Sequence, residues 1–430
     1  QNAKKMTSTI KTIYLALIYI FLPTILAAQS WLPVPIEIPE YNFLEDSKNT
    51  LVVPQGGDST LLNNFFARYD TLLREHKGKL SIVHIGGSHV QAGVLTDQIR
   101  LNLNNNDFSA ARGYVFPYKV ARTNNPHSYS VSYNGRWRTE RCVKRTHDVE
   151  LGVGGIAVYT DDVDADIKIS LPQTKSIVKS YYQRIKLLGY VKDGADWAVM
   201  PVIKTNNGLN QIFYPNYDYV DNSHYTFDLR GNYTEFNIYF QQLDTVIHTF
   251  VVTGFVLEND EPGIVYHAIG TNGAAVPSYL GCERFESEIS VLAPDMVVFG
   301  IGINDAVPTD FDVEAFKNNY NTLMAKIRKS SPNCVFVFIT NNDSYRKVRR
   351  RRYAPNPNAV KVQKAMYELA IQNRGAVFDQ FELMGGLRSM RKWQAAKMAK
   401  RDLIHFTPKG YQLLGDLFYN AFINYYLGLR

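Results

Sequence analysis

The chain has 430 residues, 45% of them hydrophobic and 20% charged, a composition that is typical of folded proteins and excludes a disordered or collagen-like chain. Its length allows two or three domains. The formal net charge of +7 favours acidic partners such as an anionic glycan or a membrane surface, and because no RNP, zinc-finger or helix–turn–helix pattern is present we expect no nucleic-acid partner.

Residues 1–28 have the order of a secretory signal peptide. Three lysines come first, an apolar run over residues 13–26 follows, and two alanines end the segment. This order predicts cleavage near Ala28 or Gln29 and a protein in the periplasm or outside the cell, with no stable membrane span after cleavage. The alternative is a retained membrane anchor, although the run is short and Pro23 interrupts it.

After this leader the pattern is that of the first part of an α/β domain. Residues 31–58 are rich in Pro, Asn and Gly, which predicts an irregular segment. Over residues 59–76 apolar side chains recur at helical spacing. An apolar run at 80–85 then predicts a buried strand, and residues 91–104 predict a second helix.

Residues 128–258 have a different pattern of hydrophobic and polar residues. Short stretches of alternating hydrophobicity are separated by Gly, Asn and Asp turns, and helical runs are missing. Regularly spaced short strands of this kind predict a β-sandwich. We therefore expect a second domain that interrupts the α/β domain.

From residue 259 the alternation of strands and helices returns. Four apolar runs begin at residues 264, 296, 334 and 376, and helical patterns cover residues 311–329, 357–373 and 408–426. Runs that are apolar at nearly every position predict parallel strands buried on both faces. The predicted fold is an α/β domain over 31–127 and 259–430, with a parallel sheet covered by helices and a β-sandwich inserted at 128–258.

The cysteines are sparse. Cys142, Cys282 and Cys334 are an odd set that cannot form a disulfide framework for a chain of this size, and their spacing is not that of a metal site. We expect no essential disulfide, no catalytic metal and no organic cofactor.

Polar residues follow two of the predicted strands, at the carboxyl edge of the sheet where active residues gather in open α/β folds. Ser88 follows the strand at 80–85 in "IGGSH", and Gly86 and Gly87 permit a sharp turn that points its hydroxyl outward. The simpler reading of Ser88 is a helix N-cap. Asn304, in "GIND", carries an amide that can donate to a developing oxyanion.

Two further segments complete this set. In "AIGTNGAA", Gly273 follows a third strand, where its backbone N–H can serve as another donor. In "RDLIH", Asp402 and His405 lie three residues apart before a predicted helix. A tight turn there lets the carboxylate bind the imidazole and fix its tautomer.

The four segments "GGS", "GTNGA", "GIND" and "DLIH", in this order, resemble the sequence blocks of the SGNH hydrolases, also called GDSL-like esterases. The resemblance implies a flavodoxin-like α/β fold, with Ser88 as nucleophile and His405, oriented by Asp402, as base. It also implies an oxyanion hole formed by the amides of Ser88 and Gly273 and the side chain of Asn304. Gly87 stands where the family usually has Asp, a departure that bears on loop geometry more than on catalysis.

The inserted sandwich indicates which members of this family the chain resembles most in architecture. The architecture is similar to that of bacterial peptidoglycan O-acetylesterases, whose insert resembles a carbohydrate-binding module. This resemblance implies an exported serine esterase that removes acetyl groups from an O-acetylated polysaccharide, at the 6-hydroxyl of N-acetylmuramic acid in peptidoglycan, through an acetyl-serine. A polysaccharide O-acetyltransferase with the same residues and a non-catalytic glycan-binding protein remain alternatives.

Three other residues are candidates for substrate binding. His89 is next to the predicted nucleophile, and the ring of Trp137 can stack on a sugar unless it is part of the core. Arg349 lies in "YRKVRRRRY", which can attract an anionic glycan near the active-site rim or can be a solvated loop.

Overall fold

The computed structural model describes residues 31–430 except 105–107, 173–180, 207–209, 217–222 and 350–351. The signal peptide predicted over residues 1–28 and its cleavage site lie outside the described residues. Within the described part of the chain, no helix combines the length and hydrophobicity needed to cross a membrane.

A six-stranded sheet forms the centre of the α/β domain. Its strands, in spatial order, are β1 (Leu51–Val52), β19 (Ala376–Phe378), β16 (Val335–Ile339), β15 (Met296–Gly300), β2 (Lys79–Gly86) and β14 (Gly263–Gly270). All pairs are parallel except β1 with β19. The predicted parallel sheet is therefore confirmed, and its strands are apolar along their length because both faces are covered.

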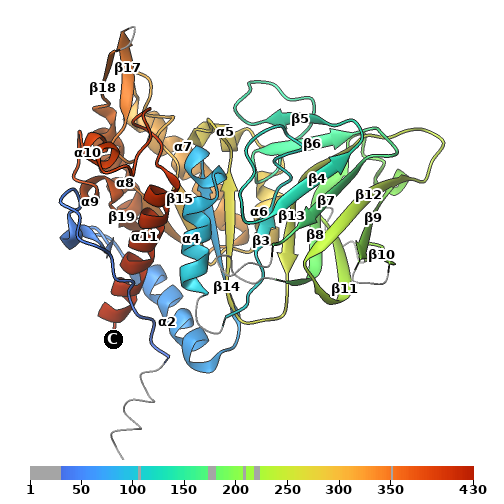
Figure 1. The fold of residues 1–430 in the computed structure, drawn as a ribbon, viewed down its shortest axis with the longest axis horizontal. Coiled ribbons are helices and arrows are strands. Elements are labelled where there is room, and N and C mark those ends of the chain that lie inside the picture. Colours follow the sequence, from blue (N-terminus) through green and yellow to red (C-terminus); the bar gives the residue numbers. More distant parts are fainter. Residues whose placement is uncertain (1–30, 105–107, 173–180, 207–209, 217–222, 350–351) are drawn as a thin grey trace, which may run out of the picture.

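Helices cover the two faces of this sheet (Figure 1). One hydrophobic cluster joins the sheet to α2 (Thr60–Glu75), α4 (Val94–Leu103) and α11 (Pro408–Gly428). The cluster on the other face includes side chains of α5 (Val276–Leu280), α6 (Phe285–Leu292), α7 (Val313–Ser330) and α8 (Asn358–Gln372). The strands and helices thus form the layered fold that the apolar runs predict.

The helix predicted over residues 91–104 is divided. A short helix, α3 (Ser88–Gln91), precedes α4, and Gly93 between them has a φ of 81°. A Cβ on Gly93 would lie 2.6 Å from Cβ of Pro126, so the chain turns at a residue that has no side chain. The break separates the segment that carries Ser88 from the longer helix that packs on the sheet.

Most of the other strands form a sandwich of two antiparallel sheets, drawn at right in Figure 1. One sheet contains β10 (Asn210–Phe213), β9 (Val199–Asn206), β12 (Glu235–Gln242), β7 (Asp166–Ser170) and β4 (Ser130–Asn134). The other contains β11 (Tyr225–Tyr233), β8 (Tyr182–Val191), β13 (Phe250–Glu258), β6 (Ile156–Thr160) and β5 (Arg138–Arg141). The short strand β3 (Gly113–Val115) also pairs with β13, although it precedes residue 128 in the sequence.

The sandwich and the α/β domain are packed together without a break in the core. A single hydrophobic cluster contains Val83 of β2, Phe299 of β15 and side chains of both sandwich sheets such as Ile169 and Phe250. Only residues 259–262 separate β13 from β14. This arrangement fixes the sandwich beside the sheet edge where β2 and β14 lie.

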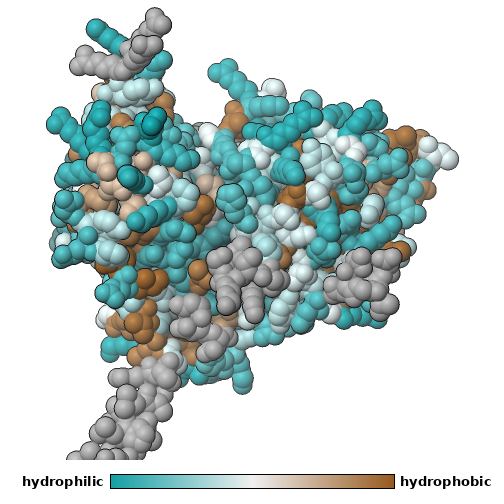
Figure 2. Space-filling view, in the orientation of Figure 1, coloured by the Kyte–Doolittle hydropathy of each residue, from teal (hydrophilic) through white to brown (hydrophobic). Residues whose placement is uncertain are grey.

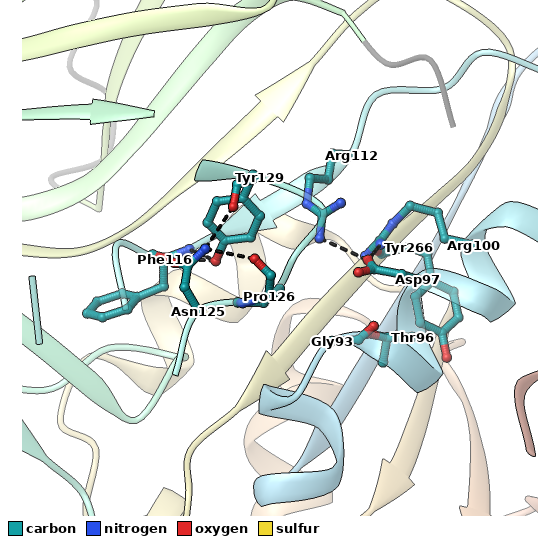
Figure 3. A network of polar contacts seen from close by, with 10 residues as sticks. All are labelled: Gly93, Thr96, Asp97, Arg100, Arg112, Phe116, Asn125, Pro126, Tyr129 and Tyr266. Atoms are coloured by element: carbon teal, nitrogen blue, oxygen red, sulfur yellow. Dashed lines mark hydrogen bonds and ion pairs between the residues drawn. The ribbon is translucent and has the colours of Figure 1, made fainter. Parts of the chain in front are cut away.

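A buried polar network adds to this junction (Figure 3). Asp97 of α4 forms ion pairs with Arg100 and with Arg112, which lies 3.0 Å away. Arg100 also donates to the backbone oxygen of Tyr266, 2.8 Å away, while the guanidinium of Arg112 lies over the ring of Tyr129. Burial raises the pKa of Asp97, but the two guanidinium groups lower it more, so the carboxylate stays ionised.

A two-stranded hairpin, β17 (Tyr345–Arg349) and β18 (Arg352–Pro355), stands apart from these layers and projects at upper left in Figure 1. It follows β16, so it begins at the carboxyl edge of the central sheet. Two short helices, α9 (Gln380–Leu383) and α10 (Met390–Ala395), lie between β19 and the segment that carries Asp402 and His405.

Candidate active site

Ser88 is placed at the carboxyl edge of the sheet by a turn that requires glycine. Strand β2 ends at Gly86, and Ser88 is the first residue of α3. A Cβ on Gly86 would lie 2.3 Å from a methyl group of Val90 and 2.9 Å from the backbone oxygen of Gly300. Any larger residue at position 86 would meet these atoms. Because Gly86 has no side chain, the chain can fold back closely enough to present the Ser88 hydroxyl.

A chain of hydrogen bonds joins three of the predicted residues. The hydroxyl of Ser88 lies 2.9 Å from Nε2 of His405. Nδ1 of the same ring lies 3.0 Å from a carboxylate oxygen of Asp402. The structure therefore brings together a hydroxyl, an imidazole and a carboxylate, although more than 300 positions separate the first from the others in the sequence.

Asp402 is held in place by its own turn. One carboxylate oxygen accepts the backbone N–H groups of Ile404 and His405, each at 2.9 Å, while the other faces the ring of His405. Partial burial raises the pKa of Asp402, but these hydrogen bonds lower it more, and the net pKa lies below the usual value. Asp402 is therefore ionised at neutral pH and can orient the imidazole.

The loop that carries Asp402 and His405 is fixed from outside as well. The backbone N–H of Tyr345 in β17 donates to the oxygen of Leu403 at 3.1 Å. The side-chain amide of Asn342 donates to the oxygen of Ile404, also at 3.1 Å. Sequence reasoning missed Asn342, because an asparagine after a strand is also a common turn residue.

The predicted oxyanion donors lie beside the turn before Ser88. The amide of Asn304 donates to the backbone oxygen of Ala274 at 2.9 Å. A Cβ on Gly87 would lie 3.5 Å from that amide nitrogen and from the same oxygen. Asn304 and the segment of Gly273 and Ala274 are thus brought next to Ser88, and the turn into α3 forms with Gly87 in the position where the family has Asp.

These donors have capacity left for a ligand. A primary amide carries two hydrogens, so Asn304 keeps one after bonding Ala274. Within the described residues, the backbone N–H groups of Gly273 and Ser88 have no acceptor. Gly273 has a φ of 83°, a conformation that favours glycine.

Gln91 holds the segment that contains Gly273, and it was not predicted from the sequence. Its side-chain oxygen accepts the backbone N–H of Asn272 at 2.7 Å. Its amide nitrogen donates to the hydroxyl of Thr123 at 2.9 Å and to Asn124. Gln91 is 2% exposed, so these contacts satisfy a buried amide and fix the loop.

His89 lies behind His405. The two ring centroids are 5.2 Å apart, and Nδ1 of His89 lies 2.8 Å from the hydroxyl of Tyr411 in α11. Burial, and secondarily the nearby His405, lowers the pKa of His89 to about 3, so the ring is neutral. The structure therefore places His89 as a packing partner of His405, and Tyr411 is a supporting residue that no sequence pattern singles out.

The other two candidates lie in different environments. Trp137 is 9% exposed, its N–H donates to the oxygen of Asn134 at 2.8 Å, and its ring packs edge-on against Phe240. This burial in the sandwich core argues against the predicted contact between Trp137 and substrate. Arg349 is exposed on β17, in the hairpin whose first residue bonds the loop that carries His405.

One contact from the sandwich reaches the site. A Cβ on Gly273 would lie 3.6 Å from a methyl group of Val143, which follows β5. Sequence reasoning missed Val143, because no local pattern indicates which loop of an inserted domain faces the sheet edge.

The described residues contain no group of three or more His, Cys, Asp or Glu side chains that could hold a metal ion. All three cysteines are buried and unbridged.

Residues 253–413 match the model of the GDSL-like lipase/acylhydrolase family. This segment includes Gly273, Asn304, Asp402 and His405, and the hydrogen bond to His405 adds Ser88 from outside it. The α/β part of the chain is therefore an SGNH hydrolase domain. Its fold and the resemblance of the four sequence blocks agree with this membership.

Solved structures show how far the fold of this SGNH hydrolase extends. One described as a peptidoglycan O-acetylesterase aligns with a TM-score of 0.69 and 18% identity, over 87% of this chain and 98% of that chain. The shared fold thus includes an inserted sandwich.

Two smaller proteins align less well. A lipase/acylhydrolase from Enterococcus faecalis has a TM-score of 0.30 and 23% identity, over 38% of this chain and 77% of that chain. An acetyl-xylooligosaccharide esterase from Geobacillus has a TM-score of 0.29 and 16% identity, over 37% and 73%. No curated protein gives a significant match to the sequence.

Proposed function

We propose that this SGNH hydrolase is an exported serine esterase that removes O-acetyl groups from a polysaccharide, with peptidoglycan as its substrate. The observation that carries the proposal is the hydrogen-bonded series Ser88, His405 and Asp402 beside the unused donors of Gly273 and Asn304. The description of the similar structure as a peptidoglycan O-acetylesterase supports the choice of substrate.

In the first step, Nε2 of His405 takes the proton of the Ser88 hydroxyl as Oγ attacks the acetyl carbonyl carbon. The carbonyl oxygen becomes negative and accepts the N–H groups of Ser88 and Gly273 and the free hydrogen of Asn304. The ionised Asp402 holds the proton of His405 on Nδ1, which leaves Nε2 as the base.

In the second step, the bond to the sugar oxygen breaks. His405 gives its proton to that oxygen, the sugar hydroxyl leaves, and the acetyl group stays on Ser88. A water molecule, deprotonated by His405, then attacks the acetyl-serine. Acetate leaves, and His405 returns a proton to Ser88.

Exposure of the site favours water as the acceptor over a second sugar. The side chains of His405 and Asp402 are 33% and 44% exposed, so water reaches the base directly. Transfer to a sugar requires that water be excluded from the acetyl-serine.

The test is acetate release from O-acetylated peptidoglycan, compared with acetylated xylan and O-acetylated sialic acid. We expect release to be fastest from peptidoglycan and to be lost in Ser88→Ala. Unchanged release by Ser88→Ala would overturn the assignment of the nucleophile. Acetylation of an added, unacetylated glycan without matching acetate release would identify a transferase instead.

A further inference from the structure

Exposed lysine and arginine side chains surround the loop that carries Asp402 and His405. We call this group the basic rim, and it consists of Lys347, Arg349, Arg388, Arg391, Lys400 and Arg401. Lys347 and Arg349 belong to the hairpin strand β17, Arg388 and Arg391 lie at α10, and Lys400 and Arg401 directly precede Asp402.

Backbone contacts tie the basic rim to the catalytic loop. Besides the bond from Tyr345 to Leu403, the N–H of Lys400 donates to the oxygen of His405 at 2.7 Å. The guanidinium of Arg391 lies 5.1 Å from the centre of the Tyr345 ring, so α10 and the hairpin are neighbours. Figure 1 shows the hairpin projecting beside α10, and Figure 2 shows mainly hydrophilic residues along this upper edge. The rim is therefore tied to the loop that carries Asp402 and His405.

The charges of the basic rim are not neutralised. Residues 383–401 contain six lysines and arginines and no acidic residue, and no member of the rim forms an ion pair with a described residue. Some cations elsewhere in the described chain are paired: Lys317, for example, lies 2.8 Å from Glu314 and 2.6 Å from Glu368. Cations without ion-pair partners, gathered around one loop, create a positive potential there.

The sandwich adds to this potential from another side. Arg145 follows Val143, which approaches Gly273, and its exposed side chain has no acidic partner in the part of the chain that the structure describes. Lys144, between them, is paired with Glu140 at 2.7 Å. An unpaired cation of the sandwich thus lies two residues from the side chain that approaches Gly273.

An acetyl ester on a sugar is neutral, so the reacting group itself gives no reason for this charge. Guanidinium and ammonium groups bind carboxylates through charge-assisted hydrogen bonds. Resting on the function proposed above, we propose that the basic rim binds carboxylates carried by the substrate polymer and lays an anionic glycan across the active site. In peptidoglycan the carboxylates of the peptide stems are the matching groups.

The contacts are electrostatic and exposed, so salt should weaken them. The screening length is about 8 Å at physiological ionic strength. We expect the KM for O-acetylated peptidoglycan to rise with salt, whereas the KM for the neutral ester 4-nitrophenyl acetate should respond much less.

The variant that tests the rim is Lys347→Glu/Arg349→Glu, because both side chains are exposed on a hairpin outside the core. The readout is kcat/KM for O-acetylated peptidoglycan divided by kcat/KM for 4-nitrophenyl acetate. We expect this ratio to fall roughly tenfold or more, mainly through KM. The matched control is Lys77→Glu/Lys192→Glu, which makes the same change in net charge in a loop before β2 and after β8. An equal fall in both variants, or no fall in the first, would overturn the proposal.

A binding experiment with peptidoglycan tests the basic rim independently of the proposed esterase activity. Ser88→Ala should sediment with unacetylated peptidoglycan at low salt, and removal of the peptide stems with an amidase should release it. This result would support the rim even if acetate release from peptidoglycan failed. Equal binding to stripped glycan, to phosphatidylglycerol vesicles or to a DNA oligonucleotide would contradict recognition of stem carboxylates.

Discussion

The side chain of Asn304 does two things that require a primary amide. It donates one hydrogen to the backbone oxygen of Ala274 at 2.9 Å, and in the proposed function it donates the other to the substrate oxygen. Aspartate is the same size, but its carboxylate has no hydrogen to donate and would repel both oxygens. Position 304 therefore requires a side chain that donates hydrogen bonds as well as one of this size.

We expect Asn304→Ala to lower kcat for 4-nitrophenyl acetate by roughly 10²- to 10³-fold, because one donor to the oxyanion is lost. The hydroxyl, imidazole and carboxylate remain in place, so labelling of Ser88 by a fluorophosphonate should persist. Asn304→Asp should be at least as slow. Wild-type kcat in either variant would show that another group stabilises the oxyanion.

Asp402 fixes the tautomer of His405 through the 3.0 Å contact with Nδ1. In Asp402→Asn the new amide can donate to Nδ1, which places the ring proton on Nε2 and removes the base that faces Ser88. We expect kcat to fall by roughly 10⁴-fold, as in other triads. Single-turnover acetylation of Ser88, followed by mass spectrometry, should show the same loss. A fall of less than tenfold would mean that Asp402 only supports the loop.

At the scale of elements, the site is assembled from loops that are each held by a contact from another element. The hairpin bonds the loop of His405, and α3 bonds the loop of Gly273 through Gln91. These contacts are single hydrogen bonds, so each is open to a specific test.

Gln91→Leu removes the acceptor for Asn272 and leaves a buried N–H without a partner. We expect the segment of Gly273 to shift and kcat to fall between roughly 10- and 100-fold, since small displacements of catalytic groups have effects of this size. Thr123→Val is the control, because it removes one acceptor of the Gln91 amide and leaves the backbone N–H of Asn272 bonded to Gln91. Equal loss of kcat in both variants would argue against a specific role of the bond to Asn272.

At the scale of the whole molecule, Glu288 of α6 joins the α/β domain to the sandwich. Its carboxylate is fully buried and accepts the N–H of Val153 at 2.9 Å and the hydroxyl of Thr253 at 2.6 Å. Burial raises its pKa from 4.5 to about 7 despite these hydrogen bonds.

The folded state therefore holds a proton on Glu288 that the unfolded state loses above pH 4.5. Stability from this group falls as the pH rises between 4.5 and about 7, by on the order of 3 kcal/mol in total. We expect Glu288→Gln to resemble the wild type in Tm at pH 5 and to exceed it at pH 8. A wild-type Tm that rises relative to the variant over this range would contradict the raised pKa.

The amino-acid sequence predicted those parts of the fold that also carry the candidate site. Strands buried on both faces are apolar throughout, and Ser88 and Asn304 follow two of them at the carboxyl edge, so both the sheet and this edge were predictable. Contacts between distant segments leave no periodic signal, which is why β3, Gln91 and Tyr411 were missed. Trp137 shows the same limit, because a ring that suits a sugar suits a sandwich core equally well.

Val143 has a consequence for how new specificities can arise. It lies beside Gly273 but comes from the sandwich, so one neighbour of this backbone N–H donor and the residues Ser88 and His405 lie on separate parts of the chain. A mutant library confined to residues 143–146 would change the surface beside Gly273 while leaving the side chains of Ser88, Asp402 and His405 untouched.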